Sequence, residues 1–332
     1  MVEVRYLSSE DTAGLASPAE YVDAVRAGYR QRCEGAPAEP RTRLDSDDPR
    51  GMLTGYLALL PETGAMGGYT YSAGFESNDA QFVLPLFDAE SGELLALVDG
   101  AQMNPFKTGA AGAVGVDALA REDATRLGLV GSGTQARGQL LATATVRELE
   151  RVSVFSPTAE HRKSFAAEMD GRLDASVEAV GSSNRAVTGA DIVVTATTAN
   201  EPVVDAEALD PGTHITAMGQ YHPHRREVDA ETVARATYVP DIESRLEQDA
   251  GAYLGALEAG TIEAGHAHAE LGAVVAGEAP GRTDRAEITL VDSGGTGIET
   301  VAAAKLLYDR ACEQGVGETL ELSPASEAFP GR

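Results

Sequence analysis

The sequence contains no tryptophan, only three lysines (Lys107, Lys163 and Lys305) and only two cysteines. The cysteines, Cys33 and Cys312, lie far apart and form no metal-type cluster. Such a pair fits reduced thiols better than a disulfide framework. We therefore assign the cysteines no chemistry and do not expect a disulfide-stabilised protein.

Positive charge is scarce. The chain has 52 acidic and 26 basic residues, which gives a net charge of −26. Self-repulsion of this size keeps a protein soluble, and concentrated salt screens it. We interpret the charge as that of a halophile's protein. No basic stripe is present that could displace counterions from phosphates, so we expect no nucleic-acid partner.

Long apolar runs are also missing. No window approaches the roughly 18 apolar residues of a membrane span, and the first residues do not resemble a signal peptide. We therefore expect a cytoplasmic protein without a membrane partner. With 332 residues, 43% of them hydrophobic, the chain is long enough for two lobes with separate cores.

Strands and helices alternate regularly from residue 127 onward. Strands are predicted at residues 127–131, 152–155 and 176–180, with helices at 134–148 and 158–169 between them. Further apolar, β-branched runs follow at residues 192–197, 214–218, 238–239 and 288–291. This order predicts an α/β fold with a doubly wound, Rossmann-like parallel sheet.

The first part of the chain is less regular. A helix is predicted at residues 18–33, a glycine-rich region of loops and strands at 51–75, and strands at 82–87 and 94–98. A last amphipathic helix, roughly residues 297–313, suits a return of the chain to this first lobe.

The strongest local motif is Gly131-x-Gly133-x-x-Ala136, between a predicted strand and a predicted helix. Here the first glycine permits a tight turn, the second lets the backbone approach a pyrophosphate, and Ala136 allows close packing. The free N–H groups of the helix would face the phosphates. A second glycine-rich segment, residues 294–297, comes too late to begin such a unit. We expect it to form a loop near the nicotinamide side.

The end of the second strand bears on the choice between NAD and NADP. An NAD site usually has an acidic residue there, whereas this chain has Ser156. Ser156, Thr158, Arg162 and Lys163 could donate hydrogen bonds to a 2′-phosphate. NADP is thus at least as plausible as NAD. Alternatively, Arg162 and Lys163 simply solvate a helix face.

Five ordered motifs resemble those of the ornithine cyclodeaminase and mu-crystallin family. They are Glu39-Pro-Arg41-Thr, Asp99-Gly100 with Lys107-Thr108-Gly-Ala, Gly131-x-Gly-x-Gln135-Ala136, residues 190–197, and Pro211-Gly-Thr-His214. The likeness runs from about Tyr6 to the final helix. It implies a substrate-binding and dimerisation lobe (residues 1–123, completed by 293–332), a Rossmann-like lobe (124–292) and a homodimer.

The resemblance also implies roles for individual residues. Arg41 looks like the family's carboxylate-binding arginine, and Lys107 stands where the family usually has a second arginine. The expected cofactor contacts are Thr108, Gly131, Ser132, Gly133, Thr134, Gln135, Ala136, Ser156, Thr158, Arg162, Thr195, Ala196, Thr197, Met218, Gly219 and Gly295.

Two positions depart from the family's pattern. Tyr69 stands near the position of the family's catalytic lysine, and Tyr221 replaces the aspartate that handles the substrate's amines in ornithine cyclodeaminase. We predict that Tyr69, Tyr221, His222 or His224 could give a proton to an imine nitrogen or a carbonyl. Alternatively, the two histidines are exposed loop residues and the tyrosines are packing residues.

Other chemistries lack a motif. His266 and His268 are two residues apart with no third ligand at a recognisable spacing, so we expect no metal site. Neither a nucleophile elbow nor a phosphate-binding loop of the Gly-Lys-Ser/Thr type is present, which leaves hydrolase and kinase activities unsupported.

Three hypotheses remain. The first is an NAD(P)-dependent oxidoreductase that transfers a hydride to or from the α-carbon of a small amino, imino or keto acid, in the manner of an alanine dehydrogenase or ketimine reductase. In this hypothesis Arg41 and Lys107 bind the carboxylate. The second is an ornithine cyclodeaminase, and the third is a non-catalytic NADP-binding protein like mu-crystallin.

Overall fold

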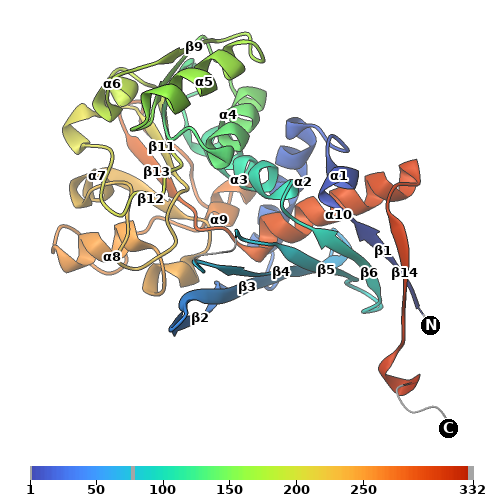
Figure 1. Cartoon of the computed structure of the whole chain (residues 1–332). Helices are drawn as coiled ribbons and strands as arrows, with labels where there is room; N and C mark the ends of the chain where they lie inside the picture. Colours follow the sequence, from blue (N-terminus) through green and yellow to red (C-terminus); the bar gives the residue numbers. More distant parts are fainter. Residues whose placement is uncertain (1, 76–78, 328–332) are drawn as a thin grey trace.

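The computed structural model describes residues 2–75 and 79–327 (Figure 1). Residue 1 and residues 328–332, the two ends of the predicted first lobe, therefore lie outside the described residues. The described chain forms two seven-stranded sheets. None of its helices is both long and apolar enough to span a membrane.

The second sheet is fully parallel, in the order β12-β13-β11-β10-β7-β8-β9. Its strands are β7 (Arg126–Val130), β8 (Arg151–Phe155), β9 (Ser176–Ala179), β10 (Ile192–Thr195), β11 (His214–Ala217), β12 (Ala236–Pro240) and β13 (Ile288–Asp292). The helices between these strands are α4 (Thr134–Val146), α5 (Ala159–Asp170), α6 (Ser183–Val187), α7 (Ala230–Arg235), α8 (Gly251–Glu258) and α9 (Leu271–Ala276), with short 3₁₀ turns η1 (Ala206–Ala208) and η2 (Glu243–Glu247). The predicted Rossmann-like α/β class is confirmed.

The first sheet is mixed, in the order β14-β1-β6-β5-β4-β3-β2, and only the β1–β6 pair is parallel. Its strands are β1 (Val2–Leu7), β2 (Thr42–Asp47), β3 (Arg50–Leu60), β4 (Ala65–Ala73), β5 (Val83–Asp88), β6 (Leu94–Asp99) and β14 (Glu318–Leu322). The short elements α1 (Ser9–Thr12) and η3 (Ala325–Glu327) lie near the ends of the chain.

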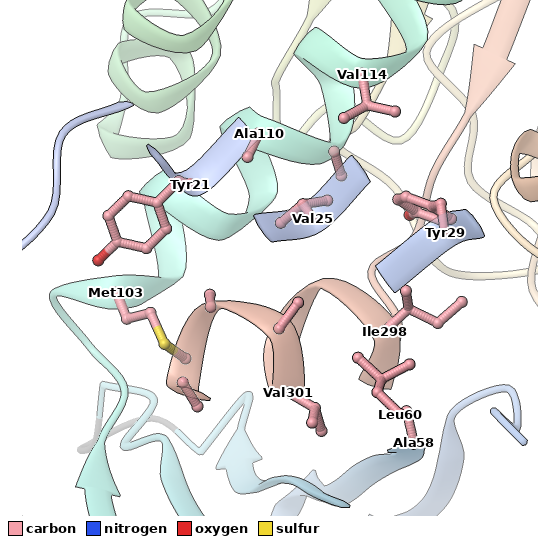
Figure 2. Packing of buried hydrophobic residues seen from close by; sticks show 14 of the residues in the cluster. Tyr21, Val25, Tyr29, Ala58, Leu60, Met103, Ala110, Val114, Ile298 and Val301 are labelled. Carbon is pink, nitrogen blue, oxygen red and sulfur yellow. The ribbon is translucent and has the colours of Figure 1, made fainter. Parts of the chain in front are cut away.

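Three long helices pack together next to the first sheet. They are α2 (Pro18–Cys33), α3 (Met103–Leu119) and α10 (Gly297–Gln314). One of them, α10, lies directly on the sheet (Figure 2). Figure 2 shows α10 running between β3 on one side and α2 and α3 on the other, with Ile298 and Val301 in the shared core. The C-terminal helix thus shares a core with α2, α3 and β3.

Helix α3 was not predicted, because its sequence is dominated by glycine and alanine. The structure supplies the reason for the small residues. A Cβ on Gly109 would lie 2.2 Å from the carbonyl oxygen of Gly138 in α4, so the backbones of the two helices touch. Tertiary packing here overrides the low helix propensity of glycine. Strands β1, β2 and β14 were also missed; β2 and β14 are mostly exposed edge strands without clear alternation.

Candidate functional site

The glycine turn joins β7 to α4. Gly131 has a φ of +127°, and a Cβ there would lie 2.3 Å from the carbonyl oxygen of Ala196, so a side chain is excluded. Around Gly133 a Cβ would meet no atom within 4 Å. No side chain caps the first turn of α4, which begins at Thr134, so the free N–H groups of this turn have no side-chain acceptor. This turn can therefore hold a pyrophosphate.

Next to this turn lie the residues predicted to contact the adenosine ribose. The hydroxyl of Ser132 donates to that of Ser156, with 2.8 Å between the two oxygens. Arg162 donates to the carbonyl oxygens of Ser156 (2.9 Å) and Pro157 (3.1 Å), so it is folded onto the backbone. The place of the usual acidic residue is therefore taken by hydroxyls, with a guanidinium beside them.

The other predicted cofactor residues follow strands β10 and β11, at the same edge of the parallel sheet. A buried carboxylate that sequence reasoning missed, Glu227, ties these loops together. It accepts from the Thr195 hydroxyl (2.9 Å) and from the backbone N–H groups of Thr197 and Gly219 (both 2.7 Å). Burial raises the pKa of Glu227, although these hydrogen bonds oppose the shift. Glu227 thus holds the loops after β10 and β11 in a fixed relation to each other.

Three further predicted residues flank this edge. Met218, directly after β11, is 7% exposed. Thr108 lies in α3, and its carbonyl oxygen accepts from the side chain of Gln139 in α4 (2.8 Å). The side-chain oxygen of Gln135 is buried without a hydrogen-bond partner among the described residues.

Arg41, just before β2, is 4% exposed. Its guanidinium donates to the carbonyl oxygen of Gly294 (2.7 Å) and to the Tyr71 hydroxyl. The guanidinium carbon Cζ lies 4.8 Å from the centre of the Tyr56 ring and 4.2 Å from the centre of the Tyr221 ring. Aromatic rings of this kind hold a cation in place without neutralising its charge.

Lys107, in α3, is also buried, at 1% exposed. Its ammonium donates to Glu299 (3.2 Å) and to the Tyr56 hydroxyl (3.3 Å). Burial alone would lower the pKa of Lys107, but Tyr56 and Glu299 outweigh it and shift that pKa upward. Lys107 therefore stays charged, and it is paired with Glu299.

Gly295 lies close to both buried cations, Arg41 and Lys107. A Cβ there would lie 3.7 Å from the guanidinium of Arg41 and 3.7 Å from the ammonium of Lys107, and its φ is +85°. The segment read from sequence as a nicotinamide-side loop thus lies between the two predicted carboxylate-binding residues. Thr296 of this segment caps α10 together with Glu299.

The four candidate proton donors differ in their surroundings. Tyr69 is fully buried and its hydroxyl donates to the carbonyl oxygen of Gly100 (3.0 Å), so that proton is already engaged. Tyr221 covers Arg41. His222 accepts from the backbone N–H of His224 (3.2 Å), and both lie in the loop after β11. The structure brings Tyr221 and His222 to the mouth of the site and leaves Tyr69 behind it.

Tyr56 and Tyr71 were missed by the sequence reasoning. Tyr71 lies two residues from Tyr69 in β4, and side chains two apart in a strand share a face, so this signal was available. Tyr56 is paired directly with Tyr69 across the β3–β4 ladder. That pairing depends on strand register, which the glycine-rich segment does not specify by itself.

A buried ionic cluster supports Arg41 from the side of the parallel sheet. Arg245 binds Asp241 (2.8 Å) and Asp249 (2.6 Å), and Asp249 also lies 3.9 Å from Arg41. Asp292 completes the cluster and accepts from the Tyr238 hydroxyl (2.6 Å). Asp249 therefore links the substrate side to the cofactor side of the molecule.

Three histidines outside this region have structural partners. His266 and His268 each lie 2.9 Å from a backbone carbonyl oxygen, of Val233 and Pro280 respectively. His214 lies between the hydroxyls of Thr289 and Thr216, and burial lowers its pKa to about 3. Among the residues that the structure describes, no group of three potential metal ligands is found.

The glycine turn at the end of a fully parallel sheet, followed by a helix whose N-terminus has no side-chain cap, defines a dinucleotide-binding protein. The model of the Ornithine cyclodeaminase/mu-crystallin family matches residues 3–315, and the chain belongs to this family.

Three relatives illustrate the family. The structure of the Thermococcus litoralis Δ1-pyrroline-2-carboxylate reductase in complex with NADH and L-proline has a TM-score of 0.91 and 33% identity, covering 96% of this chain and 100% of the other. An archaeal alanine dehydrogenase dimer with bound NAD has a TM-score of 0.90 and 30% identity, covering 97% and 100%. The iminosuccinate reductase of Paracoccus denitrificans is 31% identical over 95% of this chain and 99% of its own.

Proposed function

We propose that this protein is an NAD(P)-dependent oxidoreductase that transfers a hydride to or from the α-carbon of a small amino, imino or keto acid. The class of activity expected from the sequence is confirmed by the named relatives, which reduce or dehydrogenate such compounds. The observation that carries the proposal in this chain is the placement of Arg41, Lys107 and Gly295 beside the loops at the nicotinamide end of the sheet.

The substrate's carboxylate binds Arg41 in this proposal. The guanidinium is held by Gly294 and by aromatic rings, and Asp249, 3.9 Å away, is shared with Arg245. The guanidinium of Arg41 therefore retains positive charge that can form a bidentate contact with a carboxylate. Tyr221, whose ring lies against Arg41, must move aside when the carboxylate enters.

The contacts of Lys107 favour a different role from the carboxylate contact expected from the sequence. Its charge is already matched by Glu299, and it donates to the oxygen of Tyr56. The hydroxyl proton of Tyr56 has no acceptor among the described residues. We therefore assign the proton of the reaction to Tyr56, with Lys107 stabilising the phenolate that remains.

The bound cofactor supplies or removes the hydride. In the reductive direction, the O–H bond of Tyr56 breaks as an N–H bond forms on the substrate, while the α-carbon gains the hydride. The Tyr56 oxygen then recovers a proton from solvent. Because hydroxyls replace the usual acidic residue at Ser156, we expect the protein to accept both NADH and NADPH.

An assay with purified protein in concentrated salt tests this function. Pyruvate with ammonia, oxaloacetate with ammonia, and a cyclic imino acid are each mixed with NADH or NADPH, and absorbance at the nicotinamide band is followed. We expect consumption of reduced cofactor with at least one substrate. Conversion of ornithine to proline and ammonia without net change of cofactor would instead identify a cyclodeaminase, and binding without turnover a non-catalytic protein.

We also propose that the protein is a homodimer formed through the outer face of the first sheet. Leu44, Leu53, Leu57 and Val83 are between 48% and 63% exposed there. An apolar hollow of about 460 Å³ lies beside Leu57. Exposed apolar areas of this kind mark association surfaces. Light scattering should give twice the mass of the chain, and Leu57→Glu should give a monomer.

The halophilic origin is supported by charge alone. A net charge of −26 repels itself in the folded state, and salt screens that repulsion. We therefore expect the melting temperature to rise by about 5 °C or more between dilute and molar potassium chloride. A melting temperature that is independent of salt would contradict this origin.

A further inference from the structure

A cavity of about 420 Å³ is lined by Tyr221, whose ring also lies against the guanidinium of Arg41. It lies between the turn of the β2–β3 hairpin, the end of β4 and the loop that follows β11. Its walls include Arg43, Arg50, Arg225, Tyr221, His222 and Gly219. Neither the proposed proton route nor the carboxylate contact of Arg41 uses this space.

The charge of the cavity is opposite to that of the protein. Three arginines line it, against two aspartates, Asp45 and Asp47, in a chain whose net charge is −26. Arg43 is paired with Asp45 at 2.7 Å, whereas Arg225 forms no ion pair with any residue that the structure describes. A net positive cavity in so acidic a protein indicates an anionic ligand.

The cavity is also in reach of the reacting atoms. Thr198 and Gly219, which line it, follow strands β10 and β11 at the edge where a nicotinamide would lie. Tyr221 forms both a wall of the cavity and the cover of Arg41, at 4.2 Å from the guanidinium carbon. A substrate held at Arg41 by one end could therefore extend past Tyr221.

We propose that this cavity binds a second, distal carboxylate, so that the substrate is a dicarboxylic imino or keto acid. The inference rests on the proposed oxidoreductase function and specifies its substrate class. Arg225 is the principal contact, and Arg43 and Arg50 add to the positive potential. The apolar lining is small, with Met52 and Ala73 as its side chains, so an alkyl side chain would find few partners.

His222 provides a signal of occupancy that does not depend on turnover. Its pKa is lowered by burial, and by Arg43, Arg225 and His224, with Asp45 opposing them. A carboxylate bound next to Arg225 would offset these positive charges and raise the pKa of His222. A monocarboxylate bound at Arg41 alone would affect His222 much less.

The kinetic experiment compares kcat/KM for oxaloacetate, 2-oxoglutarate and pyruvate, each with ammonia and the better cofactor, in the wild type and in Arg225→Gln. We expect a dicarboxylic substrate to be preferred. Arg225→Gln should lower its kcat/KM by about 10- to 100-fold, with a much smaller loss for pyruvate. Arg185→Gln, an exposed arginine on α6, is the matched control and should change neither value.

The binding experiment follows histidine resonances of the NAD⁺-loaded protein in titrations with succinate or propionate, with His222→Gln to assign the signal. Succinate should raise the pKa of His222 and propionate should not.

The outcomes separate the two proposals. A preference for pyruvate or a cyclic monocarboxylate, an equal loss with all substrates in Arg225→Gln, or no response of His222 to succinate would overturn the second carboxylate site and leave the oxidoreductase function standing. No oxidation of NADH or NADPH with any substrate would overturn the function, and the substrate class with it.

Discussion

The two sheets of this protein present their functional residues in different ways. In the parallel sheet, the turn that can hold a pyrophosphate is one contiguous segment, residues 131–136, and its neighbours follow successive strands. On the mixed sheet and its helices, the substrate side combines Arg41, Tyr56, Lys107 and Gly295, which are distant in sequence. The glycine turn is formed by neighbouring residues of the chain. The substrate side is assembled only when the strands of the mixed sheet pair in the correct register.

This difference has an energetic counterpart. The cofactor turn requires glycine at positions 131 and 133, where a side chain would take up space, and it requires free N–H groups. The substrate side depends on buried charges that must be matched, such as Lys107 with Glu299. Removing one partner of a buried pair leaves an uncompensated charge. Substitutions on the substrate side should therefore alter activity more than those beside the cofactor.

The largest effect is expected from Arg41→Ala. Loss of the guanidinium should lower kcat/KM for the carboxylate substrate by about 100- to 1000-fold, because the contact with the carboxylate is charge-assisted and buried. The affinity for NADH, measured by fluorescence titration, should change little. Comparable losses in substrate and cofactor affinity would remove the distinction between the two regions.

Tyr56→Phe should have the next largest effect. If Tyr56 supplies the proton, kcat should fall by about 100-fold with the substrate KM nearly unchanged. Tyr29→Phe is the matched control, because the buried Tyr29 hydroxyl has no hydrogen-bond partner among the described residues and its removal should leave kcat intact. An active Tyr56→Phe enzyme would exclude the proton route through Lys107 and Tyr56.

Glu227→Gln examines the cofactor side. One amide oxygen cannot accept from the three donors that the carboxylate now serves, so the loops after β10 and β11 should loosen. We expect about a tenfold weaker affinity for NADH and a smaller change in substrate KM. Calorimetric titration with NADH measures the first value. A selective rise in substrate KM would place Glu227 on the substrate side instead.

The smallest effect on activity is expected at His214, which lies inside the parallel sheet. Its pKa is about 3 in the folded protein, below the usual 6.5, so below pH 6.5 only the unfolded chain takes up the proton. The free energy of unfolding should then fall by about 1.4 kcal/mol per pH unit from pH 6.5 toward pH 3. His214→Asn should show a shallower acid slope in urea titrations. Parallel slopes would mean that His214 is protonated in the folded state.

The sequence predicted the parallel sheet well because its strands are buried on both faces and its glycine turn is contiguous. It predicted α2 at its observed bounds and α10 almost so. Helix α3 was not predicted because it contains glycines, which weaken a helix in isolation. In the structure these glycines allow close contact with α4. Long-range packing of this kind leaves no local signature in one sequence.

The candidate site divides in the same way. Arg41 and Lys107 were singled out by motif resemblance, and the structure places both beside Gly295. Glu299 and Tyr56 were not found, because their relation to Lys107 joins residues as far as 192 positions apart. Glu227 was missed because a single acidic residue in an acidic chain carries no signal until its burial is known.

The most direct measurement is the fate of a deuterium label. Reduced cofactor deuterated at the transferred position of the nicotinamide is incubated with the preferred keto acid and ammonia, and the product is analysed by mass spectrometry and NMR. We predict an amino acid that is one mass unit heavier, with deuterium at the α-carbon. An unlabelled product, or oxidised cofactor without a labelled amino acid, would contradict it.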